Sequence, residues 1–233
     1  MTSARYFGLI PAAGIGARMG AAVPKQYADI AGKPMLMHVL DTFAEANAIT
    51  HTFVVVSPDD GYIDGTLAAS HLQAHAGLSI LRVGGATRQD SVLHGLRTMR
   101  GQVNDDDWIL VHDAARPGLS IDLIAKLIAA VSNDDVGGLL ALPVVDTLKR
   151  ADTLQRIDQT VPREQLWAAQ TPQMFRYGVL RRALEQAINV TDEAGAIESL
   201  GLKPKLVEGS TRNFKVTLPH DVVLAELYLK GRA

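Results

Sequence analysis

Short apolar runs alternate with segments of helical periodicity along most of the chain. Residues 6–11, 52–57, 78–83, 108–112 and 138–143 are predominantly apolar, which predicts buried strands. Between them, apolar residues recur at helical spacing in residues 35–46, roughly 62–75, 89–100 and 121–131, the last behind Ser120 as a predicted N-cap. Apolar strands that alternate with helices are typical of a mostly parallel sheet covered on both faces. The pattern therefore predicts a doubly wound α/β fold, with ligands bound at the carboxyl ends of its strands.

Residues 144–163 interrupt this rhythm. Their sequence, VVDTLKRADTLQRIDQTVPR, alternates β-branched and polar residues around a turn at 151–153, which predicts a polar β-hairpin. An isolated hairpin is only marginally stable in water, so we expect it to pack against another surface, such as a second subunit. Helices are predicted at about 177–188, 192–200 and 218–230, with a strand near 205–207. We expect one domain over residues 1–233, with 144–163 as a protruding arm.

Composition narrows the class of protein. Hydrophobic residues make up 47% of the chain and charged residues 21%, as in ordinary globular proteins. A formal net charge of −2 predicts no general attraction to nucleic acid or to anionic membranes. The chain has no cysteine, which excludes disulfides, thiolate metal sites and a cysteine nucleophile. The sequence shows neither a signal peptide nor a run long enough to span a membrane, so we expect a cytoplasmic protein.

The loop after the first predicted strand is rich in glycine. Gly14, Gly16 and Gly20 give a spacing one residue longer than the dinucleotide fingerprint, and the ending typical of a P-loop is absent. Glycines alone are as consistent with a tight turn as with a ligand site. Arg18 and Lys25 favour the ligand site, because backbone N–H groups and two cations together suit a triphosphate.

Two further loops follow predicted strands. VGGATRQDSV, residues 83–92, predicts either a turn with a helix cap or a pocket for a base or ribose that includes Ser91. VHDAARP, residues 112–117, places Asp113 at the end of an apolar strand, where a carboxylate is costly unless it is paired or bound. Asp113 and Arg116 therefore form either a structural ion pair or part of a site.

Seven motifs in order carry a family resemblance. PAAGIGARMG…PKQY, GGATRQDSV, VHDAARP, VVDTLKR, LWAAQTPQMF, TDEA and VEGSTRNFKVT run from Ile10 to about Asp221. Together they closely resemble the 2-C-methyl-D-erythritol 4-phosphate cytidylyltransferases of the non-mevalonate isoprenoid pathway. The resemblance implies a Rossmann-like nucleotidyltransferase fold and transfer of a cytidylyl group from CTP to methylerythritol phosphate, with release of pyrophosphate.

The resemblance also implies roles for individual residues. The catalytic cations would be Arg18, Lys25 and Lys215. The CTP site would include Ala12, Ala13, Gly14, Gly16, Gly84, Gly85, Ser91, Asp113 and Ala114. The acceptor would contact Asp113, Arg116, Thr147, Arg163, Thr191 and Lys215. Thr147 and Arg163 belong to the arm, which in this family reaches into a partner subunit, so a homodimer is implied.

The chemistry fits these residues. A phosphate monoester is largely a dianion at neutral pH, so the acceptor needs no general base. Positioning and electrostatic stabilisation should carry most of the rate of an in-line attack on the α-phosphate. Mg²⁺ would enter with CTP and be held mainly by its phosphates, since the sequence shows no dedicated carboxylate cage; Asp113 is one potential ligand.

Three alternatives remain open at the level of sequence. A pentitol-phosphate cytidylyltransferase, such as one acting on ribitol 5-phosphate, would share the loop motifs. A nucleotide-binding protein without activity would not require cations at each end of the reaction. A nicotinamide dehydrogenase is disfavoured by the glycine spacing and by Ser57 and Pro58, which follow the second strand in place of an acidic residue.

Overall fold

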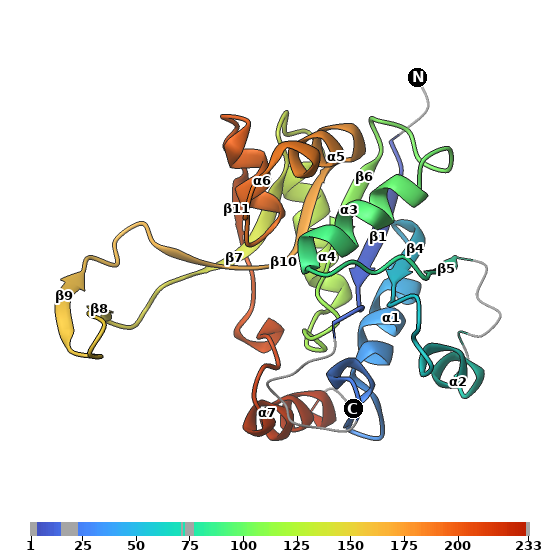
Figure 1. The fold of residues 1–233 in the computed structure, drawn as a ribbon, viewed down its shortest axis with the longest axis horizontal. Coiled ribbons are helices and arrows are strands. Elements are labelled where there is room, and N and C mark those ends of the chain that lie inside the picture. The colour runs from blue at the N-terminus through green and yellow to red at the C-terminus, as the bar shows by residue number, and fades with distance from the viewer. Residues whose placement is uncertain (1–3, 15–22, 71, 73–76, 232–233) are drawn as a thin grey trace.

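A seven-stranded sheet forms the centre of the protein (Figure 1). The computed structural model describes residues 4–14, 23–70, 72 and 77–231. In the order β11-β7-β10-β6-β1-β4-β5, the strands of the sheet are Lys205–Glu208, Gly138–Pro143, Trp167–Arg176, Trp108–Val111, Tyr6–Pro11, Ile49–Val55 and Leu78–Leu81. The predicted apolar runs are thus confirmed as strands, with ends that differ by a few residues.

Most strand pairs in this sheet are parallel. Strand β1 pairs in parallel with β4 and β6, β4 with β5, and β11 with β7. Strand β10 is antiparallel to both of its neighbours, β6 and β7. The predicted doubly wound, mostly parallel sheet is confirmed, and β10 is an additional central strand that the sequence analysis left unassigned.

Helices cover both faces of the sheet. Helices α1 (Met35–Glu45) and α4 (Ile121–Val131) pack in one apolar cluster, with Ile10 and Leu110 from the strands. Helices α3 (Arg88–Thr98), α5 (Tyr177–Gln186) and α6 (Glu193–Ser199) pack in a second cluster, with Leu9 and Ile109. Because neighbouring residues of β1 and β6 enter opposite clusters, both faces of these strands are buried, which explains their continuous apolar sequences.

Side-chain caps fix the starts of helices α3, α4 and α6. Thr87 and Asp90 form a capping box at α3, in which each side chain accepts a hydrogen bond from the backbone N–H of the other. Ser120 caps α4 as predicted, and Asp192 caps α6 by accepting from the N–H of Gly195 at 2.9 Å. These caps hold the loops before each helix in a defined conformation.

Smaller elements complete the fold. Helix α2 (Ile63–Ala68) is shorter than predicted, and part of the predicted range lies outside the described residues. Strands β2 (Asp29–Ile30) and β3 (Lys33–Pro34) form a small hairpin beside α7 (Pro219–Lys230). Two 3₁₀ turns, η2 (Lys25–Tyr27) and η3 (Thr211–Asn213), precede β2 and α7. None of the helices within the described ranges has the length and apolar character that crossing a membrane requires.

The predicted arm is present. Strands β8 (Leu148–Ala151) and β9 (Ile157–Val161) form an antiparallel hairpin at the end of a long extension between β7 and β10, drawn at the left of Figure 1. The turn lies at residues 152–156, slightly later than predicted. Nearly all of the residues on the two strands are exposed, so the hairpin packs against little else in its own chain.

Candidate active site

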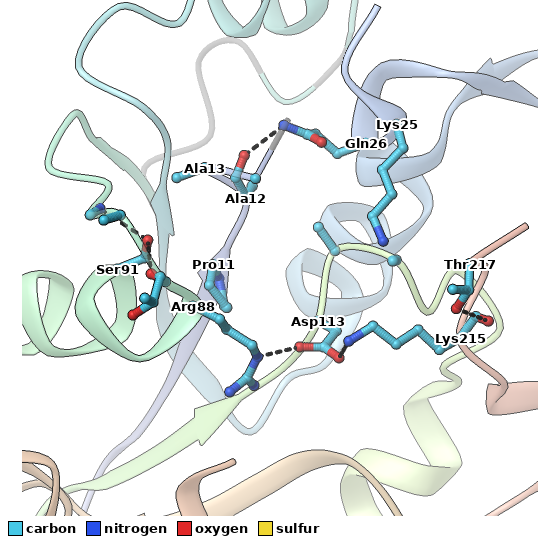
Figure 2. Close-up of a pocket in the computed structure, with 16 residues that line it drawn as sticks. Pro11, Ala12, Ala13, Lys25, Gln26, Arg88, Ser91, Asp113, Lys215 and Thr217 are labelled. Atoms are coloured by element: carbon cyan, nitrogen blue, oxygen red, sulfur yellow. Dashed lines mark hydrogen bonds and ion pairs between the residues drawn. The ribbon is translucent and has the colours of Figure 1, made fainter. Parts of the chain in front are cut away.

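A cavity of about 530 Å³ lies where β1 and β6 end, beside the loop that follows β5. In a doubly wound sheet this edge is where ligands bind. Figure 2 shows Lys25 and Lys215 reaching towards it from the side opposite Ser91 and Arg88. The residues that line the cavity are Pro11, Ala12, Ala13, Gly14, Lys25, Gln26, Gly85, Ala86, Thr87, Arg88, Ser91, Asp113, Ala114, Ala115, Lys215 and Thr217.

Many of the residues predicted from the sequence meet in this cavity. They are Ala12, Ala13, Gly14, Lys25, Gly85, Ser91, Asp113, Ala114 and Lys215. Gly84 adjoins the lining, directly before Gly85. Gly16 and Arg18 lie outside the described residues. The three loops predicted to form one site are therefore neighbours in space.

The first loop is tied to the turn that carries Lys25. Gln26 is almost fully buried, and its amide donates a hydrogen bond to the carbonyl oxygen of Ala12 at 2.7 Å. Tyr27 donates to Asp60 at 2.8 Å and stacks on Tyr62. Because these contacts of Gln26 and Tyr27 fix the turn, they also fix the backbone position from which Lys25 lines the cavity.

The second loop approaches the first so closely that it requires glycine. A Cβ atom on Gly84 would lie 2.3 Å from the Cβ of Ala13 and 2.9 Å from the carbonyl oxygen of Val56. Ser91 holds this loop from inside: its hydroxyl accepts from the N–H of Gly85 at 3.0 Å and donates to the carbonyl of Thr87 at 2.9 Å. The loop therefore presents backbone groups to the cavity in a fixed arrangement.

Asp113 is the centre of an ion network at the end of β6. One of its carboxylate oxygens accepts from Nε of Arg88 at 2.8 Å, and the other lies 2.8 Å from Nζ of Lys215. Burial alone would raise the pKa of Asp113, but the cations of Arg88 and Lys215 outweigh burial and hold that pKa far below its ordinary value. Asp113 is therefore a permanent carboxylate that orients Lys215 at the cavity.

Arg116 and His112 lie next to Asp113, outside the lining of the cavity. Arg116 lies 3.8 Å from Asp113 and donates to the carbonyl of Asn213 at 2.8 Å. His112 is fully buried; its Nδ1 accepts from the hydroxyl of Thr171 at 2.9 Å, and that hydroxyl accepts from the N–H of Asp113. Burial lowers the pKa of His112 to about 4, so the ring is neutral at physiological pH. Neither side chain lines the cavity.

The remaining predicted acceptor residues lie elsewhere. Thr191 lines a second cavity of about 230 Å³, which shares Thr87 and Arg88 with the first. Thr147 and Arg163 belong to the arm, and Arg163 donates to the carbonyl of Val145 there. Neither arm residue lines the cavity in its own chain.

Seven lining residues were not among the predicted site residues, and the polar side chains of Gln26, Arg88 and Thr217 are three of them. Gln26 and Thr217 flank predicted site residues, but nothing in their local pattern points to a pocket. Arg88 follows the second glycine pair directly, and its two acidic partners are distant in sequence. Only the spatial meeting of these segments shows what Arg88 does.

The fold and the cavity together define a class of protein. Lysines from two distant segments converge at the carboxyl edge of a mostly parallel sheet. Among the described residues that line the cavity there is no histidine to form a nucleophile and base pair. Cations and backbone groups without such a pair are what group transfer from a nucleotide requires. These are the features of an α/β nucleotidyltransferase.

Comparisons with known proteins identify the family. The family model for 2-C-methyl-D-erythritol 4-phosphate cytidylyltransferase matches residues 7–231. Proteins of that name from Dechloromonas aromatica (strain RCB) and Nitrosospira multiformis are 51% and 52% identical, over 98% and 97% of this chain and 99% and 98% of theirs. The chain belongs to the 2-C-methyl-D-erythritol 4-phosphate cytidylyltransferase family, as the ordered motifs predicted.

Solved structures agree with this assignment. A crystal structure of 4-diphosphocytidyl-2C-methyl-D-erythritol synthase is 42% identical and superposes with a TM-score of 0.86, covering 98% of this chain and all of that one. The Francisella tularensis 2-C-methyl-D-erythritol 4-phosphate cytidylyltransferase is 32% identical, with a TM-score of 0.81 over 97% of this chain and all of that chain. The structural similarity to this family therefore extends over nearly the whole length of the chain.

Proposed function

We propose that this chain transfers the cytidylyl group of CTP to the phosphate of 2-C-methyl-D-erythritol 4-phosphate within the 530 Å³ cavity. The observation that carries the residue assignment is the convergence of Lys25, Lys215 and Asp113 on that cavity, in a chain of this family. An oxygen of the acceptor phosphate forms a bond to the α-phosphorus, the bond from that phosphorus to the bridging oxygen breaks, and pyrophosphate leaves with the electron pair.

Charge placement accounts for the rate without a general base. The acceptor phosphate is largely a dianion at neutral pH, so no proton has to be removed before attack. Lys25 and Arg18 neutralise the triphosphate, and Lys215 offsets the negative charge that gathers on the α-phosphate and acceptor. Asp113 keeps Lys215 oriented through the 2.8 Å ion pair. The cavity thus lowers the repulsion between two anions and fixes them in line.

The nucleoside is recognised mainly through backbone groups. We assign nucleoside contacts to Ala12, Ala13 and Gly14 of the first loop, to Gly84, Gly85 and Ser91 of the second loop, and to Ala114. Gly16, which lies outside the described residues, is assigned to the same role. Close packing of the two loops at Gly84 brings their backbone groups together at one end of the cavity, where they are proposed to contact the base. On the acceptor side, Thr191 is proposed to contact the acceptor from the adjoining cavity, and Arg116, which does not line the first cavity, would act beside Asp113.

Mg²⁺ accompanies CTP as a partner of its phosphates. Both carboxylate oxygens of Asp113 are already engaged by Arg88 and Lys215, so this carboxylate is a poor metal ligand as it stands. Within the described part of the chain, no three His, Asp or Glu side chains gather to hold a metal ion. A hard cation would be held here by phosphate and water oxygens, and it would help to neutralise the leaving pyrophosphate.

We place the reaction in the cytoplasm.

The function is tested by pyrophosphate release. With CTP and Mg²⁺ we expect release with methylerythritol phosphate and none with ATP, GTP or UTP. Release with ribitol 5-phosphate instead of methylerythritol phosphate would show that the acceptor is a pentitol phosphate. No release with any pair of substrates would leave a nucleotide-binding role and refute the assignment.

The arm completes the acceptor site of a second copy in this proposal. Val145, Leu154 and Ile157 are all more than two thirds exposed in the single chain, which favours a partner surface. Thr147 and Arg163 lie on the same extension, and neither lines the cavity of its own chain. A homodimer in which the arms are exchanged would bring both residues to the acceptor.

Replacing Arg163 by alanine is expected to raise the KM for the acceptor about 10-fold or more, with little change in the affinity for CTP. The reason is that the acceptor phosphate would lose its proposed contact with the guanidinium of Arg163. The loops assigned to CTP belong to another part of the site and would be unchanged. Kinetics with each substrate varied in turn measure this split, and analytical ultracentrifugation reports the dimer. If the affinities for CTP and for the acceptor fell equally, the proposal that Arg163 contacts the acceptor would be wrong.

A further inference from the structure

Arg88 uses all three of its guanidinium nitrogens on two buried carboxylates. Its Nε donates to Asp113 at 2.8 Å, and its two terminal nitrogens donate to the two oxygens of Glu193 at 2.7 and 3.0 Å. The Glu193 side chain is 1% exposed and that of Asp113 is 9% exposed. The planar fork of arginine therefore fixes the direction from one carboxylate to the other. Figure 2 shows the end of this connection at which Arg88 bonds to Asp113.

Glu193 belongs to a segment that is itself held rigidly. It is the first residue of α6 and follows Asp192, the cap of that helix. Gln173 of β10 donates to Asp192 at 2.9 Å and accepts from the N–H of Ala194 at 2.7 Å. Thr191 precedes this cap directly. Any movement of Glu193 relative to Arg88 would therefore move Thr191 as well.

The other end of the connection is the reacting part of the cavity. Arg88 occupies one oxygen of Asp113, and Lys215 occupies the other. Because Glu193 pairs with the two terminal nitrogens, the charge of Arg88 is shared between two carboxylates. Lys215, at 2.8 Å, is therefore the main remaining partner of the Asp113 charge, with Arg116 farther away at 3.8 Å. Arg88 also stands in the wall between the 530 Å³ cavity and the cavity that Thr191 lines.

We propose that Arg88 and Glu193 are a positioning pair for the acceptor, setting the placement of Thr191 relative to Asp113 and Lys215. The inference rests on the proposed function, because it deepens the acceptor side of the same site. Neither residue has to touch the reacting atoms. Their loss would misplace groups that contact the acceptor, while the loops assigned to CTP remain anchored by Gln26 and Ser91.

Stability alone gives a weak reason for such a pair. Two charged groups taken out of water lose much of their hydration, and apolar replacements of similar volume are often neutral or stabilising. An apolar pair would preserve packing but would have no fixed direction and no hydrogen bond to Asp113. The double variant Arg88→Met with Glu193→Leu therefore separates packing from positioning.

The experiment compares this double variant with the wild-type protein. We expect a similar melting temperature, a KM for methylerythritol phosphate raised about 10- to 100-fold, and a dissociation constant for CTP changed less than about threefold. The conservative variant Arg88→Lys retains the charge but not the fork. It should fold and show a smaller rise in the same KM, which keeps the test valid if the double variant is unstable.

The Arg5 and Asp107 pair supplies the matched control. It lies at the amino end of β1, far along the sheet from the cavity, with Nη2 of Arg5 2.6 Å from Asp107. Arg5→Met should lower the melting temperature without changing the KM for the acceptor. That result would show that loss of stability by itself does not reproduce the kinetic effect.

Each outcome is decisive. A wild-type chain that releases no pyrophosphate from CTP and methylerythritol phosphate refutes the proposed function, and the inference falls with it. The inference alone is overturned if the wild-type protein is active and either variant, Arg88→Lys or the double variant, has an unchanged KM for the acceptor. Equal weakening of CTP and acceptor in both variants would also overturn it, because the pair would then support the whole cavity.

Discussion

Replacing Lys25 by alanine is expected to lower kcat by on the order of 10²-fold to 10³-fold, the usual loss when one preorganised electrostatic group is removed. The proposed role of Lys25 is to neutralise the triphosphate while pyrophosphate leaves. This charge is needed more in the transition state than in the bound substrate, so the effect should fall mainly on kcat. Pyrophosphate release at saturating CTP and acceptor measures it.

The fold should tolerate this change. The turn around Lys25 is fixed by Gln26, through its bond to Ala12, and by Tyr27, through its bond to Asp60. The melting temperature of the variant, followed by circular dichroism, should therefore match that of the wild type. Lys126→Ala, on the exposed side of α4, removes the same charge away from the cavity and should leave kcat unchanged. A Lys25 variant with a kcat near the wild-type value would contradict the charge assignment.

The parallel core could be predicted from the sequence because burial on both faces leaves its mark on every residue. Trp108, Ile109, Leu110 and Val111 are all fully buried, and they appear as an uninterrupted apolar run. The arm could be predicted for the opposite reason: its exposed strands alternate polar and β-branched residues. Both signals are local, since each depends on the surroundings of a single strand.

Strand β10 could not be predicted in this way. Gln170, Thr171 and Gln173 are buried, and polar residues beside Pro172 indicate a loop when they are read locally. The structure resolves this because their partners come from distant segments: Gln170 donates to Ser210, and Gln173 donates to the cap of α6. Its pairing with β7 shifts register between Ala169 and Gln173, so the proline sits where the ladder is already interrupted.

The same division applies to the cavity. Asp113 can be identified as a candidate from the sequence, because a carboxylate directly after an apolar strand is costly to bury without a partner. The role of Arg88 cannot be predicted in this way, because its two carboxylate partners lie 25 and 105 residues away in the sequence. Local sequence thus indicates which groups need partners, whereas the fold decides which partners they obtain.

Replacing Asp113 by asparagine is expected to destabilise the protein by about 3 to 5 kcal/mol, as happens when one member of a buried ion pair is removed. The carboxylate faces Arg88 on one oxygen and Lys215 on the other, so an amide would turn its NH₂ group towards one of these cations. Turnover should fall by at least on the order of 10²-fold, because Lys215 loses the anion that orients it. Urea unfolding and pyrophosphate release measure the two effects.

The pH dependence separates this role from that of a general base. The pKa of Asp113 is lowered in the folded state, so its contribution to stability is complete above the ordinary value of 3.8 and is lost only as pH falls below it. Between pH 6 and 9 the difference in unfolding free energy between the two proteins should therefore be constant. The acidic limb of kcat/KM should lie near pH 6, where the acceptor phosphate takes up its proton, and should keep that midpoint in the variant.

The buried carboxylate of Asp107 provides the control for this last comparison. It is 3% exposed and accepts hydrogen bonds from Arg5 and from the backbone of Asn104, at the end of the sheet away from the cavity. Asp107→Asn should therefore also cost stability, though less than Asp113→Asn because the Arg5 side chain is 41% exposed, while the folded enzyme keeps its kcat. If Asp107→Asn lowered kcat as much as Asp113→Asn, the loss at Asp113 would reflect weakened folding rather than the orientation of Lys215. An acidic limb that disappeared only in Asp113→Asn would instead make this carboxylate a base.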